Sequence, residues 1–189
     1  MVNASPAKPQ ELTEVHNLFE IALGKDYITK ESLLVEILSK NSQIFVAKEG
    51  NIIIGAANCS YFKHTELASH LPSEMSDLVQ QYLDLKPREY VGKIDGVVVT
   101  PDKQKRGIGR QLVQMEIEWL TPRVQKLIIM ARIKEETCPA ESMLIDMGFI
   151  ELATVENFWK QDSLEKKYNC PVCKNPCRCS AKLFQRDML

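Results

Sequence analysis

The chain has 189 residues, of which 44% are hydrophobic, which is enough for one globular domain with a sizeable core. Its 24 basic and 25 acidic side chains leave a net charge of −1, so no global basic field favours nucleic acid or a membrane surface. The first residues lack the apolar run of a signal peptide, and no stretch approaches the roughly 18 apolar residues of a membrane-spanning helix. We therefore expect a cytoplasmic protein that binds neither membranes nor nucleic acid.

The first half of the chain predicts two helices and then a hairpin. Apolar residues recur at helical spacing over residues 9–24, and a second helix over 30–40 has Thr29 as its amino-terminal cap. Residues 43–62 predict two strands that turn at 49–51. The polar segment that follows, residues 63–90 with one expected helix over 73–84, is interpreted as an insertion between strands.

The second half alternates strands and helices. Residues 90–99 predict a strand in which Gly96 marks a bulge or a close backbone approach. A helix opens at Gly107, a strand follows over 125–133, and a short helix is expected at 137–148, capped by Thr137. Strands over 149–155 and 180–189 enclose a cysteine-rich region. The order predicts a mixed α/β fold with a central sheet, in a single domain over residues 1–189.

The opening of the helix at Gly107 has the features of an anion site. Main-chain N–H groups at a helix start lack intrahelical partners, and the helix dipole adds partial positive charge there. Gly107 and Gly109 carry no Cβ, so a phosphate can reach the backbone, and the surrounding lysines and arginines would meet a further phosphate. The segment lacks both a P-loop motif and the third glycine of a dinucleotide fingerprint. A solvated basic turn is the alternative interpretation.

The stretch Gln104-Lys105-Arg106-Gly107-Ile108-Gly109 resembles the Arg/Gln-x-x-Gly-x-Gly/Ala motif of the GNAT superfamily, the acetyl-CoA-dependent N-acetyltransferases. A second block over 135–149 is similar to that family at Glu136, Ala140, Gly148 and Phe149. The resemblance covers residues 44–62, 91–155 and 181–188. It implies a mixed, splayed sheet flanked by helices, with acetyl-CoA as co-substrate.

The resemblance also implies where the cofactor binds. In the family the pantetheine arm lies along the fourth strand, between splayed strands, and the pyrophosphate lies on the glycine turn. The implied cofactor-binding residues are Val97, Val98, Val99, Gln104, Lys105, Arg106, Gly107, Ile108, Gly109, Arg110 and Thr137.

The implied reaction is direct attack of an amine on the thioester, which needs a proton acceptor for the amine, a donor to the oxyanion and a proton for the thiolate. Asp95 lies where the family often places the base, and Glu89 is the second candidate. A strand amide, of Val98 or Val99, would bind the oxyanion.

The sequence departs from the family at Leu144, which stands where a tyrosine usually serves as the general acid. Thiolate release would then use water or Tyr168, or the chain binds acyl-CoA without fast turnover. The leading hypothesis is an N-acetyltransferase acting on a primary amine of a small molecule or a protein. A non-catalytic acyl-CoA-binding protein and an adaptor that uses the cysteine region are the alternatives. The oligomeric state stays open, a homodimer included.

Four of the six cysteines, Cys170, Cys173, Cys177 and Cys179, lie within ten residues. Four thiolates so close together can close a tetrahedral site, for which Zn²⁺ is the usual occupant; an iron–sulfur cluster and two disulfides are the alternatives. In the family's element order this knuckle, residues 168–180, lies in the loop before the last strand, which often walls the acceptor site. The metal would then be structural. Several acidic residues of the inserted segment would favour a cationic acceptor: Glu66, Glu74, Asp77, Asp84 and Glu89.

Overall fold

A computed structural model describes residues 2–71, 79–83, 86 and 88–188 of the chain. It contains a seven-stranded sheet in the order β1-β2-β3-β4-β5-β7-β6, in which only β4 and β5 pair in parallel. The strands are β1 (Val2–Pro6), β2 (Ser42–Glu49), β3 (Ile52–Lys63), β4 (Tyr90–Val99), β5 (Lys126–Arg132), β6 (Ile150–Val155) and β7 (Ala181–Asp187). Strands β2 to β7 confirm the predicted mixed sheet, whereas β1 was not predicted.

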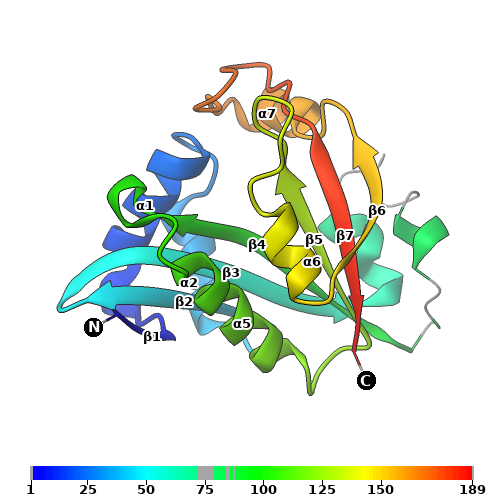
Figure 1. Cartoon of the computed structure of the whole chain (residues 1–189), viewed down its shortest axis with the longest axis horizontal. Coiled ribbons are helices and arrows are strands. Elements are labelled where there is room, and N and C mark those ends of the chain that lie inside the picture. Colours follow the sequence, from blue (N-terminus) through cyan, green and yellow to red (C-terminus); the bar gives the residue numbers. More distant parts are fainter. Residues whose placement is uncertain (1, 72–78, 84–85, 87, 189) are drawn as a thin grey trace.

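Helices cover both faces of this sheet (Figure 1). They are α1 (Leu12–Leu23), α2 (Lys30–Leu38), α3 (Leu67–His70), α5 (Ile108–Leu120), α6 (Glu141–Asp146) and α7 (Lys160–Lys166). Helices α5 and α6 bury their apolar sides against one face, where Leu112 and Leu144 share a core with Ile94 and Leu127. Helices α1 and α2 pack on the other face, and α3 covers more of it beside the start of β4. In the described part of the chain, no helix has the length and apolar character that a membrane span requires.

Local signals explain where several helices begin and end. Thr29 caps α2 as predicted, because its hydroxyl oxygen accepts a hydrogen bond from the Ser32 N–H (3.1 Å). The predicted cap of α6 is wrong, since α6 starts only after Ala140 and the Thr137 hydroxyl donates to the Lys134 carbonyl instead (3.0 Å). Most of the helix expected over 73–84 lies outside the described residues.

Strands β4 and β5 separate partway along their length. They pair from Val91 with Lys126 to Ile94 with Ile129, and β5 then continues along β7 while β4 continues along β3. The second half of β4, residues 95–99, therefore leaves one edge turned toward a gap. This is the splayed sheet that the resemblance implied, with the gap bounded by residues 95–99 and 130–132.

A β-bulge starts this separation, and its extra residue is Asp95 rather than Gly96. Asn58 on β3 pairs with Gly96, and the next residue, Cys59, already pairs with Ile94. Side chains alternate between the two faces of a strand, and the surplus residue shifts this alternation by one position. Ile94 joins the core under α5, whereas a Cβ at Gly96 would lie 3.1 Å from the Phe19 ring of α1. The bulge thus turns Asp95 and Gly96 toward the face of α1 and α2.

Candidate active site

The corner between β4 and α5 presents main-chain donors as the sequence predicted. Gly107 has φ +80° and caps α5, and the first helical bond runs from the Gln111 N–H to the Gly107 carbonyl (3.0 Å). The amides of residues 108–110 therefore precede the helical ladder. A Cβ added at Gly109 would lie 4.0 Å from Val97 Cγ1, so this corner adjoins the open edge of β4. The geometry suits an anion that approaches the backbone beside that strand.

The cations around this corner are mostly engaged in ion pairs. Lys103 Nζ lies 2.5 Å from a Glu49 carboxylate oxygen, and Arg106 Nη2 lies 3.3 Å from the other oxygen. Arg110 pairs with Asp146 at 2.8 Å. A further phosphate would therefore compete with Glu49 and Asp146 for Lys103, Arg106 and Arg110.

The direction of the β4 amides follows from its pairing with β3. The Thr100 N–H donates to the Ile54 carbonyl on β3 (2.9 Å). Because backbone groups alternate in direction along an antiparallel strand, Val98 also turns its N–H toward β3, and Val97 and Val99 turn theirs toward the gap. The Val99 carbonyl points the same way and accepts a hydrogen bond from Gln104 Nε2 (3.0 Å). Val97 and Val99, not Val98, offer main-chain groups to a molecule in the gap.

A cleft of about 1130 Å³ lies on the α1–α2 face of the sheet. The loop between α1 and α2, strands β3 and β4, helix α3 and helix α7 all contribute to its wall. Two lysines of the wall are paired with carboxylates, Lys93 with Asp95 (2.5 Å) and Lys166 with Asp162 (2.7 Å). Among the described residues, the lining contains six carboxylates and only these two lysines, so the cleft is acidic. The acidic lining residues are Asp26, Glu36, Glu66, Asp95, Asp162 and Glu165.

Glu36 is a lining residue that the sequence did not reveal. Its Oε2 accepts a hydrogen bond from Asn58 Nδ2 (2.9 Å), and Asn58 pairs with Gly96 beside the bulge. Burial raises the pKa of Glu36 to about 7, and the negative charge of Asp95 adds to this effect. A carboxyl that titrates near neutral pH beside the bulge of β4 can accept a proton from an amine.

The predicted catalytic residues lie in different places. Asp95 lines the cleft and also accepts a hydrogen bond from the Ser60 hydroxyl (3.3 Å). Glu89 precedes β4, at the end where β4 and β5 still pair, and its carboxylate accepts from the Lys86 N–H (2.8 Å). Leu144 lies on α6 and is fully buried as an apolar core residue.

Tyr168 is buried beside the cysteines, where its hydroxyl donates to the Trp159 carbonyl (3.5 Å). Tyr27 packs edge to face against the Tyr168 ring and itself lines the cleft. Burial raises the pKa of Tyr27 to about 12, with the charge of Asp95 as the next cause. Tyr27 and Tyr61 are the tyrosines that line the cleft, and the raised pKa of Tyr27 keeps its phenol protonated at neutral pH.

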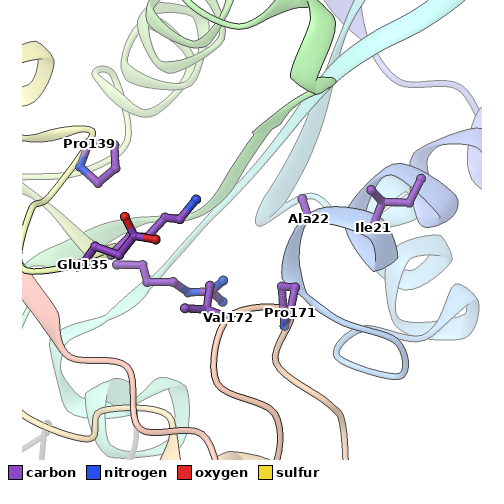
Figure 2. Close-up of a pocket in the computed structure, with 8 residues that line it drawn as sticks. Ile21, Ala22, Glu135, Pro139, Pro171 and Val172 are labelled. Atoms are coloured by element: carbon purple, nitrogen blue, oxygen red, sulfur yellow. The ribbon is translucent and has the colours of Figure 1, made fainter.

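A second, smaller cavity has a volume of about 490 Å³. Figure 2 shows residues that line it. Ile21 and Ala22 approach it from α1, Glu135 and Pro139 from the loop after β5, and Pro171 and Val172 from the cysteine loop. Arg132 and Lys134, at and just after the end of β5, also line it. The cavity lies where the separated end of β5 faces α1, and Thr137 is in the loop segment that borders it.

The four clustered cysteines come together in space with the spacing of a metal site. Their Sγ atoms all lie within 4.8 Å of one another, and the closest pairs are 3.5–3.7 Å apart. Sulfurs around a tetrahedral Zn²⁺ at about 2.3 Å would be ~3.8 Å apart, whereas a disulfide needs ~2.05 Å. All four are free thiols, and the Arg178 N–H donates to Cys173 Sγ (3.1 Å). The arrangement fits four thiolates around one metal ion.

Comparison with known proteins identifies the family of this chain. Residues 12–149 match the family described as Acetyltransferase (GNAT) family. The chain belongs to this family. The family and the fold support acetyl transfer with acetyl-CoA. No curated protein matches the sequence closely enough to count as a relative.

Solved structures share the fold of this GNAT protein at low sequence identity. NAA60 of Arabidopsis thaliana, in complex with acetyl-CoA, has a TM-score of 0.74 and 14% identity, with 99% of this chain and 98% of that chain covered. The ribosomal-protein-S18-alanine N-acetyltransferase of Escherichia coli has a TM-score of 0.66 and 14% identity, covering 100% and 94%. Naa20 of Chaetomium thermophilum, in complex with a bisubstrate analogue, has a TM-score of 0.68 and 13% identity, covering 98% and 86%.

Proposed function

We propose that this GNAT protein is an N-acetyltransferase that moves the acetyl group of acetyl-CoA to a primary amine on a cationic acceptor. The observation that carries this proposal is the acidic cleft on the α1–α2 face, which meets the gap between β4 and β5 at Asp95. The lining carboxylates outnumber the lining lysines, so they attract an ammonium group into the cleft. The E. coli structure with the same fold is an enzyme that acetylates an alanine of a ribosomal protein, so a protein amine is one class of acceptor to test.

The acetyl-CoA would bind with its diphosphate on the amides of residues 108–110 and its pantetheine along the open edge of β4. The main-chain N–H of Val97 or Val99, both turned toward the gap, would donate to the oxyanion. Glu36 would take the ammonium proton, directly or through a water, because a carboxyl with a pKa of about 7 is a better base than the ion-paired Asp95. The amine nitrogen then bonds to the carbonyl carbon to give a tetrahedral oxyanion, the carbon–sulfur bond breaks as this intermediate collapses, and the nitrogen loses its second proton to water.

The departing thiolate needs a proton that Leu144 cannot give. The Tyr27 phenol, or a water beside it, would supply this proton from the wall of the cleft. Tyr168 is the weaker candidate, since its hydroxyl already donates to the Trp159 carbonyl.

A thiol-release assay with acetyl-CoA and a panel of amines tests this function. We expect turnover with polyamines or with peptides that carry a free α-amine near basic residues, and none with the same peptides after α-acetylation. Glu36→Gln should lower kcat by about tenfold or more with CoA affinity unchanged, whereas Glu31→Gln, an exposed carboxyl at the start of the same helix, should have no effect.

A second function is supported by Leu144, which removes the family's usual acid. In this alternative the protein binds acyl-CoA as a regulatory module. Tight CoA binding without thiol release for any amine in the panel would favour it.

We also propose that the cysteine cluster binds one structural Zn²⁺. Four thiolates within 4.8 Å of one another leave no open coordination position, so the metal would organise the loop and take no part in the chemistry.

A further inference from the structure

We propose that the metal knuckle, residues 168–180, positions both walls of the acceptor cleft, so that metal occupancy controls acceptor binding without controlling acetyl-CoA binding. This inference rests on the metal site proposed above. One wall is the loop between α1 and α2, and the other is α7. Figure 1 shows α7 and the cysteine loop together at the end of the sheet where β7 begins.

The wall formed by α7 is hydrogen-bonded to the knuckle through Ser163. The Cys177 N–H donates to Ser163 Oγ (2.8 Å), and Ser163 is fully buried. Asn175 Nδ2 donates to the Ser163 carbonyl (2.8 Å) and to the Tyr168 carbonyl (3.0 Å). A displacement of the Cys177 backbone would therefore displace α7. The residues that α7 supplies to the cleft are Gln161, Asp162, Glu165 and Lys166.

The loop between α1 and α2 contacts the other end of the knuckle. Lys25 forms an antiparallel bridge with Asn169, and Tyr27 packs edge to face on Tyr168 with ring centroids 5.0 Å apart. Gly24 makes this approach with φ +121°, and a Cβ there would lie 2.4 Å from the Asn169 carbonyl oxygen. Only glycine fits so close a contact. The segment before Cys170 thus fixes where Tyr27 stands in the cleft.

Hydrogen bonds hold the knuckle to its neighbours, but no covalent bond links its four sulfurs to one another in the described chain. Cys170, Cys177 and Cys179 are buried with Tyr168 and Trp159 in a small cluster separate from the main core. A metal ion that links all four sulfurs would supply the missing constraint. The cofactor corner at Gly107–Gly109, by contrast, packs on β4 and α5 and needs no contact from the knuckle.

The first test is metal content of the full-length protein purified under reducing conditions with zinc. Elemental mass spectrometry should find one Zn²⁺ per chain, and Cys177→Ser should lose most of it. Cys138→Ser, a buried free cysteine outside the cluster, is the matched control and should keep the metal. An unmetallated protein would overturn the proposal.

The second test compares zinc-loaded and chelator-treated protein by hydrogen exchange and by ligand binding. Zinc removal should speed amide exchange by about tenfold or more in α7 and in residues 25–27, and leave α5 unchanged. CoA affinity should stay the same, and the acceptor KM should rise by about fivefold or more. The inference would be refuted by equal exchange rates in α7 with and without zinc. It would also be refuted by a loss of CoA affinity as large as the rise in acceptor KM. If no amine is acetylated, the proposed enzyme activity fails, and the exchange data still decide the role of the metal.

A variant at the contact between the α1–α2 loop and the knuckle separates the effect of metal binding from the position of this wall of the cleft. Gly24→Ala should retain zinc and CoA binding but push the α1–α2 loop away from Asn169, which speeds exchange in residues 25–27. Unchanged exchange there would show that the knuckle does not hold this wall.

Discussion

Gly107 and Gly109 differ in the backbone conformation that each requires. Gly107 has φ +80°, where any other residue is strained, whereas Gly109 is an ordinary helical residue with open space where its Cβ would be. The sequence located both glycines correctly because their spacing after a strand is unusual. It did not show that their roles differ.

This difference separates stability from cofactor binding. Gly109→Ala should keep or raise the free energy of unfolding by about 0.5 kcal/mol, because alanine favours a helix, yet weaken CoA binding because its Cβ occupies the approach beside Val97. Gly107→Ala should lower stability by about 1 kcal/mol as well as affinity. Calorimetric titration with CoA and thermal melts would measure both. Normal CoA affinity in both variants would contradict the assigned diphosphate site.

Glu36 predicts a pH dependence of the reaction. A base must be unprotonated, so kcat/KM for the amine should rise as pH passes through about 7, the pKa to which burial raises Glu36. Glu36→Gln should lack this limb of the profile, and Glu31→Gln should retain it. A limb that survives in Glu36→Gln would transfer the role of the base to another group, with Asp95→Asn as the next variant to test.

Sequence reasoning pointed to Asp95 and not to Glu36 for a physical reason. Asp95 lies on a strand that the family motif identifies, so its place in the site follows from local order. Glu36 lies on α2, where a glutamate is normally solvated, and it reaches the site only because Asn58 of β3 packs against it. Contacts between elements far apart in sequence leave no local signal.

At the scale of elements, α5 contains an ionisable side chain that is buried in the apolar core. Glu116 is fully buried against the sheet, and neither of its carboxylate oxygens has a hydrogen-bond partner among the described residues. Burial raises its pKa well above the ordinary 4.5, and the charge of Asp95 adds to the shift. The protonated form is therefore favoured in the folded state.

Because the pKa of Glu116 is raised in the folded state, protonation of Glu116 favours folding. This contribution to the free energy of unfolding is complete below pH 4.5 and is lost as pH rises through the folded-state pKa. Glu116→Leu should remove this loss and raise the free energy of unfolding at pH 8 by about 1–3 kcal/mol. Urea denaturation at several pH values would measure the slope. Glu118→Leu, an exposed position on the same helix, is the control, and an equal change there would dismiss burial as the cause.

Elements that were missed share a lack of apolar periodicity. Strand β1, with the sequence VNASP, has two apolar residues before its proline and becomes a strand only because β2 offers it a free edge. Helix α7, KQDSLEK, buries Ser163 and leaves Leu164 half exposed, which is the reverse of a normal amphipathic helix. Tertiary partners determine both elements, so neither could be read from its own residues.

For the whole molecule, the strands β2 to β7 and the helices α1, α2, α5 and α6 occur in the predicted order, because each of them contains several apolar residues. The separation of β4 from β5 came only from the resemblance, since a strand's own residues do not say which neighbour it leaves. The cysteine cluster was predicted from spacing, and its contacts with α7 and the α1–α2 loop were not.

Cofactor binding should stabilise the whole fold. At a CoA concentration a hundred times Kd, the free energy of unfolding should rise by about 2.7 kcal/mol. This should raise Tm by roughly 5–10 °C for a domain of this size. Pantetheine, which lacks the diphosphate, should give a much smaller Tm shift at the same concentration. Equal shifts for the two compounds would show that the glycine corner contributes nothing to affinity.

The surplus residue in β4 can be lost without disturbing either layer of the molecule. If Asp95 were deleted, Asn58 would still pair with Gly96 and Cys59 with Ile94, so Ile94 would stay under α5 and Gly96 would stay against α1. The deletion would remove the irregularity at which β4 parts from β5, together with the carboxylate that pairs with Lys93. A chain one residue shorter at this point should therefore keep its fold and lose the proposed catalytic cleft.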